Sequence, residues 1–531
     1  MGSMSKSKLT RRTVLQTAGA GAAALGGAAL GPARRPARAA QSSPMKLSLA
    51  VFGTGPVDDD NLFKQTLEER FDVELDLMVF DRQNMKEQIN PRIASGEIPD
   101  VIMMSDFGMR YTDYVEQGVL REVPLDAFKQ YMPKYVEATK AFNSLVWFAV
   151  QSEEKYWGVP YLQPSQLSPF TDGWRTDWLD AVGITEMPRT IEQFEEAYTK
   201  FVQDDPDGNG ESNTYALTSR GKDAAHWTFA SYFGAFGAVP HMWMQQADGT
   251  LKWGGTGEGA RQALTLLNDW YNKGLIDPEF VTTDHAQNVQ LWANGRIGYV
   301  TPSNWYRLIP GGEHYDSVMA VNPEAKVEMA WAPQGPEGKY GYFNWGPLTG
   351  GEYFFGNELG DDRLAQTLEM FEAMLTDPEL ATLLRYGVEG EHWERDSESN
   401  AIRAIPPYDT PDQRGSLGAN IQFVPVPAIQ DDWAGNKVEE YTAKAKEGNL
   451  SFVPYAGLLV PSEVSEAAAN LNPMQGQWYL DFVAGSRSLD DWDDFVSEWN
   501  GEGGEELIAA TNESVQQIEA AHADIDAALA E

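Results

Sequence analysis

Strand-like and helix-like segments alternate along the chain from residue 46 onwards. Residues 46–52 (KLSLAVF) and 73–80 (VELDLMVF) alternate apolar and polar side chains as strands do, and residues 60–71 between them have the apolar spacing of a helix. The apolar VIMM run within residues 94–106 predicts a buried parallel strand followed by a loop. Alternating strands and helices build βαβ units, so we expect an α/β fold with a mostly parallel sheet.

Later segments extend this organisation. Residues 258–274 predict a helix that ends on Gly274, residues 292–301 predict a turn and a short strand, and residues 366–387 predict two helices broken at Asp377–Pro378. Residues 474–531 have an amphipathic helical pattern throughout. No internal repeat or long linker separates the parts, so we expect domains that share several chain crossings.

The first 39 residues predict an export signal of the twin-arginine type. A basic start with the Arg11–Arg12 pair precedes an Ala- and Gly-rich apolar stretch, and Ala37–Arg38–Ala39 fits a signal-peptidase site. The apolar stretch is too weak and interrupted to predict a membrane span. We therefore exclude residues 1–39 from the fold and expect the rest of the chain to work in the periplasm or outside the cell.

Composition excludes several classes of protein. The chain has no cysteine, so it has no disulfide, no zinc–thiolate site and no lipid anchor through cysteine. The signal segment carries seven Lys or Arg and no acid, so its removal takes the net charge from −39 to about −46. Such a surface repels phosphate backbones, and we expect no nucleic-acid partner. The acids are dispersed as on a solvated, folded surface, and we expect a monomer.

The segment DPDGNGESNT (205–214) is rich in oxygen ligands and follows a predicted helix at 190–202, which begins with a capping box of Thr190 and Gln193. In a calcium loop, ligands at alternate positions converge on one cation, and a glycine at the sixth position allows the bend. Gly210 takes that position here, and Ala216 replaces the bidentate Glu of an EF-hand. We expect a weakly bound structural Ca²⁺, with a metal-free Asp/Gly turn as the alternative. Its expected ligands are Asp205, Asp207, Asn209, Glu211 and Asn213.

A series of short segments, in this order and spacing, resembles family 1 extracellular solute-binding proteins of ABC importers, in their oligosaccharide-binding branch. The segments are ASGEIPDVIMM (94–104), KYWGVPY (155–161), WRTDWLDAVGI (174–184), PRT (188–190), the oxygen-rich loop, NKGLIDPEF (272–280), NGRIGY (294–299) and YGVEGEHW (386–393). The resemblance implies a bilobed fold whose two α/β domains are joined by crossing hinge segments and close on the ligand. It also implies delivery to a membrane permease, and the similar alginate-oligosaccharide binders carry calcium on the corresponding loop.

We expect one lobe to comprise residues 44–155 and 296–355, and the other to comprise residues 156–295 and 356–531. Sugars present apolar faces and hydroxyl groups, so a sugar site needs aromatic rings for stacking and polar anchors. Seven of the 17 tryptophans lie beside Gly, Pro or Asn or in other probable loops: Trp157, Trp243, Trp253, Trp305, Trp331, Trp345 and Trp393.

Four of these tryptophans, Trp243, Trp305, Trp345 and Trp393, are our candidate stacking platforms. Asp106, directly beyond the VIMM strand, is a candidate polar anchor, because ligands of such sheets bind beyond the carboxyl ends of strands. Glu389, in the YGVEGEHW segment, is a second candidate anchor. Tyr161 is a further candidate. Arg175 is expected to form a salt bridge with Asp177 instead of contacting ligand.

No Arg/Lys cluster offsets the acidic field, which favours a neutral oligosaccharide. Two other classes of function stay open. A secreted glycoside hydrolase or lyase would use two of the 79 acids, although no nucleophile elbow, HExxH zinc site or P-loop is present and we expect no enzyme activity. A peptide-binding receptor would use the same architecture with backbone-directed hydrogen bonds.

Overall fold

The structure is a computed structural model that describes residues 43–53, 55–81, 84–105, 111–162, 170–223, 225, 228–342, 351–397, 399–421, 435–453 and 462–530. The expected signal peptide at residues 1–39 lies outside these ranges. Within them, no helix combines the length and the apolar character that crossing a membrane would require.

The first lobe is built on a five-stranded sheet with the order β2–β1–β3–β13–β6. β1 pairs in parallel with β2 and β3, which confirms the predicted βαβ beginning, and β13 pairs with β3 in the antiparallel direction. The strands of this lobe are β1 (Met45–Gly53), β2 (Val73–Asp81), β3 (Val101–Ser105), β6 (Gly158–Val159), β13 (Gly351–Phe355) and the short pairs β4 (Gln151–Ser152) with β5 (Lys155–Tyr156) and β14 (Trp393–Arg395) with β15 (Ile402–Ala404).

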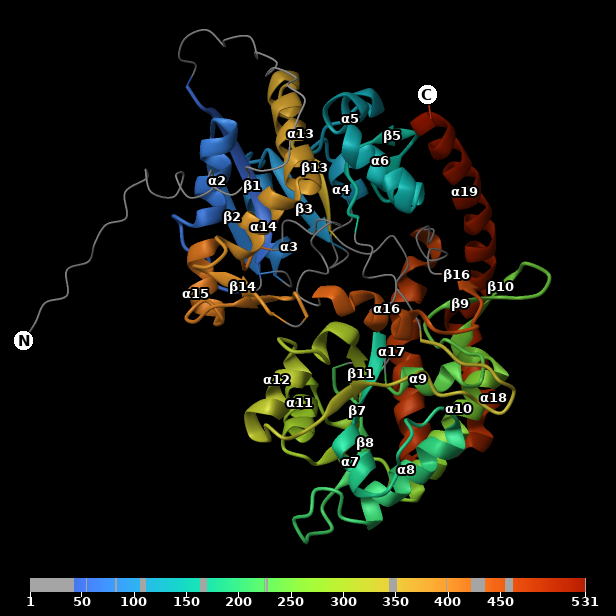
Figure 1. Ribbon diagram of the computed structural model, residues 1–531. Helices are drawn as coiled ribbons and strands as arrows, with labels where there is room; N and C mark the ends of the chain where they lie inside the picture. The colour runs from blue at the N-terminus through green and yellow to red at the C-terminus, as the bar shows by residue number, and fades with distance from the viewer. Residues whose placement is uncertain are drawn as a thin grey trace, which may run out of the picture. The chain divides into compact units, whose positions relative to one another are not determined.

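Helices from distant parts of the chain pack together in this lobe. In Figure 1, α14 (orange) lies close to α2 (blue), and the two helices are in contact. The predicted break between α13 and α14 is confirmed, because the Asp377 carboxylate accepts a hydrogen bond from the Glu379 amide and caps α14 (3.0 Å). The helices are α2 (Leu62–Phe71), α3 (Met85–Ala94), α4 (Tyr111–Glu116), α5 (Leu125–Tyr131), α6 (Pro133–Phe142), the 3-10 helix η1 (Ser144–Val150), α13 (Asp361–Thr376), α14 (Pro378–Tyr386) and α15 (Pro411–Arg414).

The second lobe contains a four-stranded sheet with the order β12–β7–β11–β8 and a three-stranded sheet with the order β10–β9–β16. β11 pairs in parallel with β8 and in antiparallel with β7, and β7 also pairs with β12. The strands are β7 (Phe170–Arg175), β8 (Tyr215–Thr218), β9 (Trp243–Gln245), β10 (Leu251–Trp253), β11 (Ile297–Asn304), β12 (Val327–Met329) and β16 (Phe452–Val453).

The helices of the second lobe follow the sequence expectations closely. The predicted capping box of α8 is present, with the Thr190 hydroxyl and the Gln193 side chain each bonded to the other residue's amide. The predicted salt bridge between Arg175 and Asp177 is also present (Nη2–Oδ2, 2.6 Å). The helices are α7 (Thr176–Ala181), α8 (Ile191–Gln203), α9 (Ala230–Gly234), α10 (Glu258–Asn272), α11 (His285–Ala293), η6 (Trp305–Arg307), α12 (Glu313–Val321), α16 (Val438–Lys446), α17 (Ser462–Ala484), α18 (Trp492–Trp499) and α19 (Glu505–Ala530).

Each lobe has its own large hydrophobic core. One core contains buried residues from β1, β3 and β13, and the other contains buried residues from β7, α8 and α17. The chain passes between them after β6, between β12 and β13, and between α15 and α16. The protein therefore has the expected fold, two α/β lobes joined by crossing segments.

The pairing of strands assigns two stretches differently from our expected lobe boundaries. Residues 296–355, expected in the first lobe, include β11 and β12, which both pair with β7 of the second lobe. Residues 356–531, expected in the second lobe, include α13 and α14, whose buried Leu368 and Leu384 belong to the first core. Periodicity identifies a strand or helix but carries no information about the sheet that it joins.

The C-terminal helix α19 connects the two cores. Leu507 near its start is buried in the second core, and Ile525 and Leu529 near its end are buried in the first. Near the end, the Ser144 hydroxyl of η1 contacts the His522 ring (2.9 Å) and the Asp526 carboxylate. The predicted helical stretch is thus confirmed as α17, α18 and α19, with interruptions at residues 485–488, before a short 3-10 helix at 489–491, and at residues 500–504.

Candidate functional site

One edge of the first sheet collects the ends of several strands. Gly351, which begins β13, lies opposite Ser105, which ends β3, and Gly53 at the end of β1 bridges to Ile421. The carboxyl ends of β1 and β3 therefore open at one edge, which is where α/β sheets bind ligands. Asp106 follows β3 in sequence and Trp345 precedes β13, and both candidates lie outside the described residues.

The second sheet has a corresponding edge at the carboxyl ends of β8 and β11, which run in parallel. His285 begins α11 and Arg307 ends η6 close to these strand ends. Glu313 accepts from the His285 ring (2.9 Å) and lies 3.4 Å from Arg307 Nη1. The hydrogen bond from His285 and the charges of His285 and Arg307 lower the pKa of Glu313 to about 2.

Two further cations near this edge are paired in the same way. Lys222 Nζ lies 2.8 Å from the Asp284 carboxylate, and Arg220 Nε lies 3.0 Å from Asp223. Positive charge at this edge is therefore balanced locally by carboxylates.

Three of the candidate tryptophans are buried. Trp305 is 1% exposed, and Trp243 and Trp393 are each 5% exposed. Trp305 packs in a small core with Tyr441 of α16, and Trp243 packs edge-on against Trp253 at 5.1 Å between ring centroids. Their rings form interior packing in this structure and present no face to solvent.

Of the 14 tryptophans that the structure describes, twelve are buried. Trp157 and Trp331 are half-buried. The Trp157 indole donates to the Ser152 carbonyl (3.4 Å). Two cations lie over the Trp331 ring, with the Arg189 guanidinium 4.3 Å and Lys444 Nζ 5.4 Å from its centroid. Of the described tryptophans, these two keep part of the ring accessible.

The two remaining candidates belong to the first lobe. Tyr161 is half-buried and lies close enough to Tyr135 and Tyr353 to affect both phenols. Glu389 is exposed and bridges through its backbone to Trp393. The described candidates are therefore divided between the lobes, with Trp243 and Trp305 in the second lobe and the others in the first.

The oxygen-rich loop turns its ligands toward one another. The Gly210 amide donates to Asp205 (2.9 Å), the Asn209 side chain donates to Asp207 (2.7 Å), and the Asn213 side chain donates to Glu211 (2.8 Å). Gly208 and Gly210 both have positive φ, as the tight turn requires.

The charges of this loop are also closely spaced. Hydrogen bonding from the Gly210 amide lowers the pKa of Asp205, whereas burial and the neighbouring Asp205 carboxyl raise the pKa of Asp207. In the described ranges, no three acidic or histidine side chains are grouped as a metal site, so the loop would rely on its amide oxygens as well. The donor set, carboxylate and amide oxygens only, fits a hard cation such as Ca²⁺.

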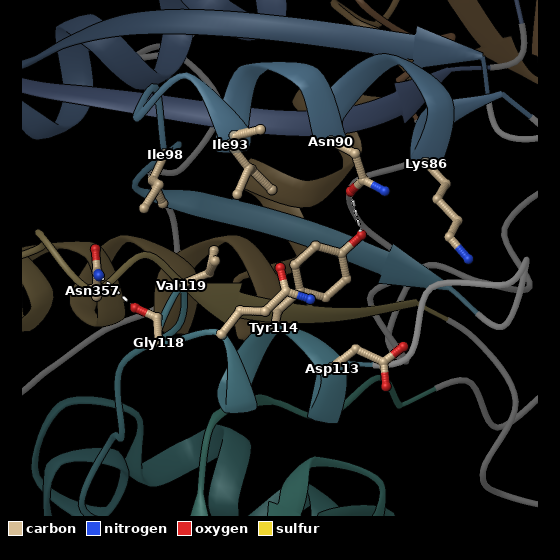
Figure 2. A pocket seen from close by; sticks show the side chains of 11 residues that line it. Lys86, Asn90, Ile93, Ile98, Asp113, Tyr114, Gly118, Val119 and Asn357 are labelled. Atoms are coloured by element: carbon tan, nitrogen blue, oxygen red, sulfur yellow. Dashed lines mark hydrogen bonds between the residues drawn. The ribbon is translucent and has the colours of Figure 1, made fainter.

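A groove of about 510 Å³ lies on the first lobe between α3 and α4 (Figure 2). We call it the α3–α4 groove. No sequence pattern had indicated it. It is lined by Lys86, Asn90, Ile93, Ala94, Ile98, Asp113, Tyr114, Gln117, Gly118, Val119 and Asn357.

Residues 58–357 match the family model described as bacterial extracellular solute-binding protein. The chain belongs to this family. The match begins shortly after β1 and ends just after β13, so it includes the carboxyl ends of β3, β8 and β11 but not that of β1.

This solute-binding protein is similar to named oligosaccharide binders over most of its length. The polygalacturonan/rhamnogalacturonan-binding protein YtcQ of Bacillus subtilis is 21% identical over 485 residues, covering 90% of this chain and 93% of the relative. The structure of the Streptococcus pneumoniae ABC-transporter substrate-binding protein FusA, an EF-hand mutant in complex with fructo-nystose, superposes with a TM-score of 0.66 at 18% identity, covering 90% and 99% of the two chains. The alginate-binding protein AlgQ2 without calcium ion superposes with a TM-score of 0.64 at 16% identity, covering 89% and 98%. The two structures show that the bilobed fold is shared.

Proposed function

We propose that this solute-binding protein is the receptor of an ABC uptake system and captures a neutral oligosaccharide between its lobes. The observation that carries the proposal is the pair of α/β lobes, each with its own core and with parallel strands whose carboxyl ends meet at one edge. Family membership supports a solute receptor, and the neutral fructo-oligosaccharide named for FusA supports a neutral sugar. The polygalacturonan named for YtcQ carries carboxylates, so it supports a sugar ligand but not a neutral one.

The mechanism follows from the two-lobed architecture. A ligand that contacts both lobes only when they are closed has a higher affinity for the closed form, so its binding shifts the population toward closure. The closed protein then delivers the sugar to a membrane permease. Asp106, Tyr161, Trp345 and Glu389 remain our proposed ligand contacts. The buried Trp243, Trp305 and Trp393 would shape the lobes beneath the site.

The preference for a neutral sugar is supported by the paired cations of the second lobe. Arg220, Lys222 and Arg307 each face a carboxylate, so a sugar carboxylate would have to compete for them. Because these cations are paired, they add no net positive field to offset the net charge of −39 of the chain.

We further propose that the protein performs no hydrolysis. A glycosidase needs an acid of raised pKa beside the scissile bond. Among the described carboxylic acids, the pKa of Asp172 is raised most clearly, to about 6, and this side chain is buried, with only 2% exposed, out of reach of a bound sugar. It lies within the second lobe, hydrogen bonded by the Tyr299 hydroxyl (2.7 Å).

One experiment separates a receptor from an enzyme. Residues 40–531 are titrated calorimetrically with a panel of neutral and uronate-containing oligosaccharides, and reducing ends are measured after long incubation. Saturable binding of a neutral oligosaccharide without new reducing ends is expected. Reducing ends that accumulate in proportion to protein would overturn the proposal, and tighter binding of the uronates would overturn its neutral-sugar part.

The oxygen-rich loop is proposed to hold a structural Ca²⁺ through Asp205, Asp207, Asn209, Glu211 and Asn213. Support comes from the convergence of these side chains and from the EF-hand and calcium named for FusA and AlgQ2. At about 1 mM Ca²⁺ and a Kd of roughly 0.1–1 mM, binding would stabilise the fold by about 0.4–1.4 kcal/mol.

Thermal unfolding with Ca²⁺ and with EGTA tests this site. We expect a lower Tm in EGTA for the native chain and no difference for Asp205→Asn combined with Asp207→Asn. An unchanged Tm of the native chain in EGTA would mean that the segment is a metal-free turn. We also propose export by the twin-arginine route, without a cysteine-linked lipid, and a monomeric state.

A further inference from the structure

Trp331 lies at the edge of the second sheet where its parallel strands end. β12 is antiparallel to β7, and β7 is antiparallel to β11, so β12 points toward the same edge as β11 and β8. The Ala330 amide extends the pairing of β12 by donating to the Asp172 carbonyl (2.7 Å), and Ser303 near the end of β11 lies opposite the neighbouring Thr171. Trp331, the residue after Ala330, therefore leaves the sheet at the edge where α/β sheets bind ligands.

Part of the Trp331 indole is accessible at this edge. The residue is half-buried, and its indole N–H pairs with no acceptor in the part of the chain that the structure describes. This nitrogen is not buried, whereas the indole nitrogens of Trp174, Trp178 and Trp499 are enclosed in the interior. An indole offers an apolar ring and one hydrogen-bond donor, which suits a sugar with its apolar C–H faces and its hydroxyl acceptors.

Three charged side chains hold the Trp331 ring in place. The Arg189 guanidinium lies 4.3 Å from the ring centroid, and Arg189 Nη2 lies 2.9 Å from Glu447 Oε1 at the end of α16. Lys444 Nζ of α16 lies 5.4 Å from the same centroid. Arg189 thus links the start of α8 to α16 beside the indole. A ring that is fixed before the ligand arrives loses little rotamer freedom on binding, so less affinity is lost to ordering.

Trp157, the other described tryptophan with an accessible part, lies away from such an edge. β13 begins opposite the end of β3, and Gly158 of the antiparallel β6 pairs with Phe354 near the other end of β13. Trp157 directly precedes Gly158, so it lies on the side away from the carboxyl end of β3. Its indole N–H is already bonded to the Ser152 carbonyl (3.4 Å). Of the described tryptophans, Trp331 alone combines an accessible ring with a place at an edge where parallel strands end.

We propose that Trp331 is the stacking platform of the second lobe for the captured oligosaccharide. One sugar ring lies against its indole, and the Nε1–H group donates to a sugar hydroxyl. Arg189, held by Glu447, is a positioning residue that acts through Trp331. This inference rests on the proposed function, because it names one contact of a sugar whose capture is itself proposed.

The test measures affinity by calorimetry on residues 40–531. The probe is the oligosaccharide that the native protein binds most tightly in a panel of neutral oligomers of glucose, fructose, galactose, mannose and xylose. Trp331→Ala removes the ring, Trp331→Leu keeps apolar bulk beneath Arg189, and Trp331→Phe keeps a ring without the N–H donor. Trp157→Ala is the matched control, since it makes the same change at the other half-buried tryptophan. The Tm of each variant is measured as well.

We expect Trp331→Ala and Trp331→Leu to weaken binding at least about tenfold, the loss typical of removing a central aromatic anchor. Trp331→Phe should weaken it about threefold, because one hydrogen bond is lost. Trp157→Ala should bind as the native protein does. Arg189→Met should also weaken binding, but it should add no further loss to Trp331→Ala, because its effect passes through the ring.

Native affinity in both Trp331→Ala and Trp331→Leu would overturn the inference. An equal loss in Trp157→Ala would overturn it too, since the effect would then come from a general loosening of the fold. A further loss in the double variant of Arg189→Met and Trp331→Ala would contradict the positioning role of Arg189. If the native protein binds no oligosaccharide of the panel, the proposed function fails instead.

Discussion

Replacing Asp172 by Asn should change how the stability of the protein depends on pH. Asp172 lies in β7 and is 2% exposed, and its carboxylate accepts a hydrogen bond from the Tyr299 hydroxyl (2.7 Å). Burial raises its pKa from 3.8 to about 6, although hydrogen bonds from Ser231, Tyr299 and Thr301 lower it in part. The phenols of Tyr198, Tyr232 and Tyr342 also face this carboxylate.

The sign follows from the protons bound in each state. Between about pH 4 and pH 6 the folded protein keeps the Asp172 proton that the unfolded chain has lost, so stability is fully present below pH 4 and falls as the pH rises through 6. A shift of about two pKa units corresponds to about 3 kcal/mol. At neutral pH, ionisation of Asp172 therefore lowers the free energy of unfolding of the native protein by about this amount. Asn keeps the shape of the side chain and cannot ionise.

Urea unfolding at a series of pH values measures this effect. The free energy of unfolding of Asp172→Asn minus that of the native protein should increase by about 2.5 kcal/mol between about pH 4 and pH 8. The exposed Asp59→Asn is the control, and its difference should stay within about 0.5 kcal/mol across the same range. A flat difference for Asp172→Asn would refute the reasoning, because the buried carboxyl would then titrate equally in both states.

Two further predictions concern the second lobe and the contact between the lobes. His314 is buried, and burial lowers its pKa to about 3. Its contribution to stability is therefore present above the unfolded pKa of 6.5 and is lost as the pH falls. In urea unfolding, His314→Gln should reduce the loss of unfolding free energy between about pH 7 and pH 5 by about 2 kcal/mol. An unchanged acid sensitivity would show that His314 is not responsible. Ile525→Ala in α19 removes a fully buried side chain and should lower the free energy of unfolding by about 2–5 kcal/mol, whereas Val321→Ala, at a 57% exposed position, should change it by less than about 0.5 kcal/mol. Equal effects of these two substitutions would argue against the packing of α19 on the first core.

Local sequence signals predicted the elements of the fold well. The strand at 46–52, the capping box of Thr190 and the helix break at Asp377–Pro378 all depend on neighbouring residues, and the structure confirms each. The lobe to which β11 belongs depends on its pairing with β7, more than 100 residues away, and no local pattern encodes it. The end of β3, beyond which we propose that the ligand binds, was predictable because the apolar VIMM run marks where a buried parallel strand ends.

The individual site residues were harder to predict for a related reason. Trp305 follows Asn304 in sequence, which suggested an accessible turn, but η6 places its ring against Tyr441 of α16. Asn, Gly and Pro report the local backbone conformation, whereas burial depends on segments distant in sequence. The α3–α4 groove was not predicted for the same reason, because its lining combines residues from α3, α4 and the turn after β13.

The position of α19 has a consequence for the order of folding during synthesis. Ile525 and Leu529 complete a core whose other residues begin at Leu47, so the earliest and latest parts of the chain meet there. Domains usually fold one after another as they leave the ribosome. Here the core of the lobe that is synthesised first cannot finish packing until Ile525 and Leu529 have emerged from the ribosome.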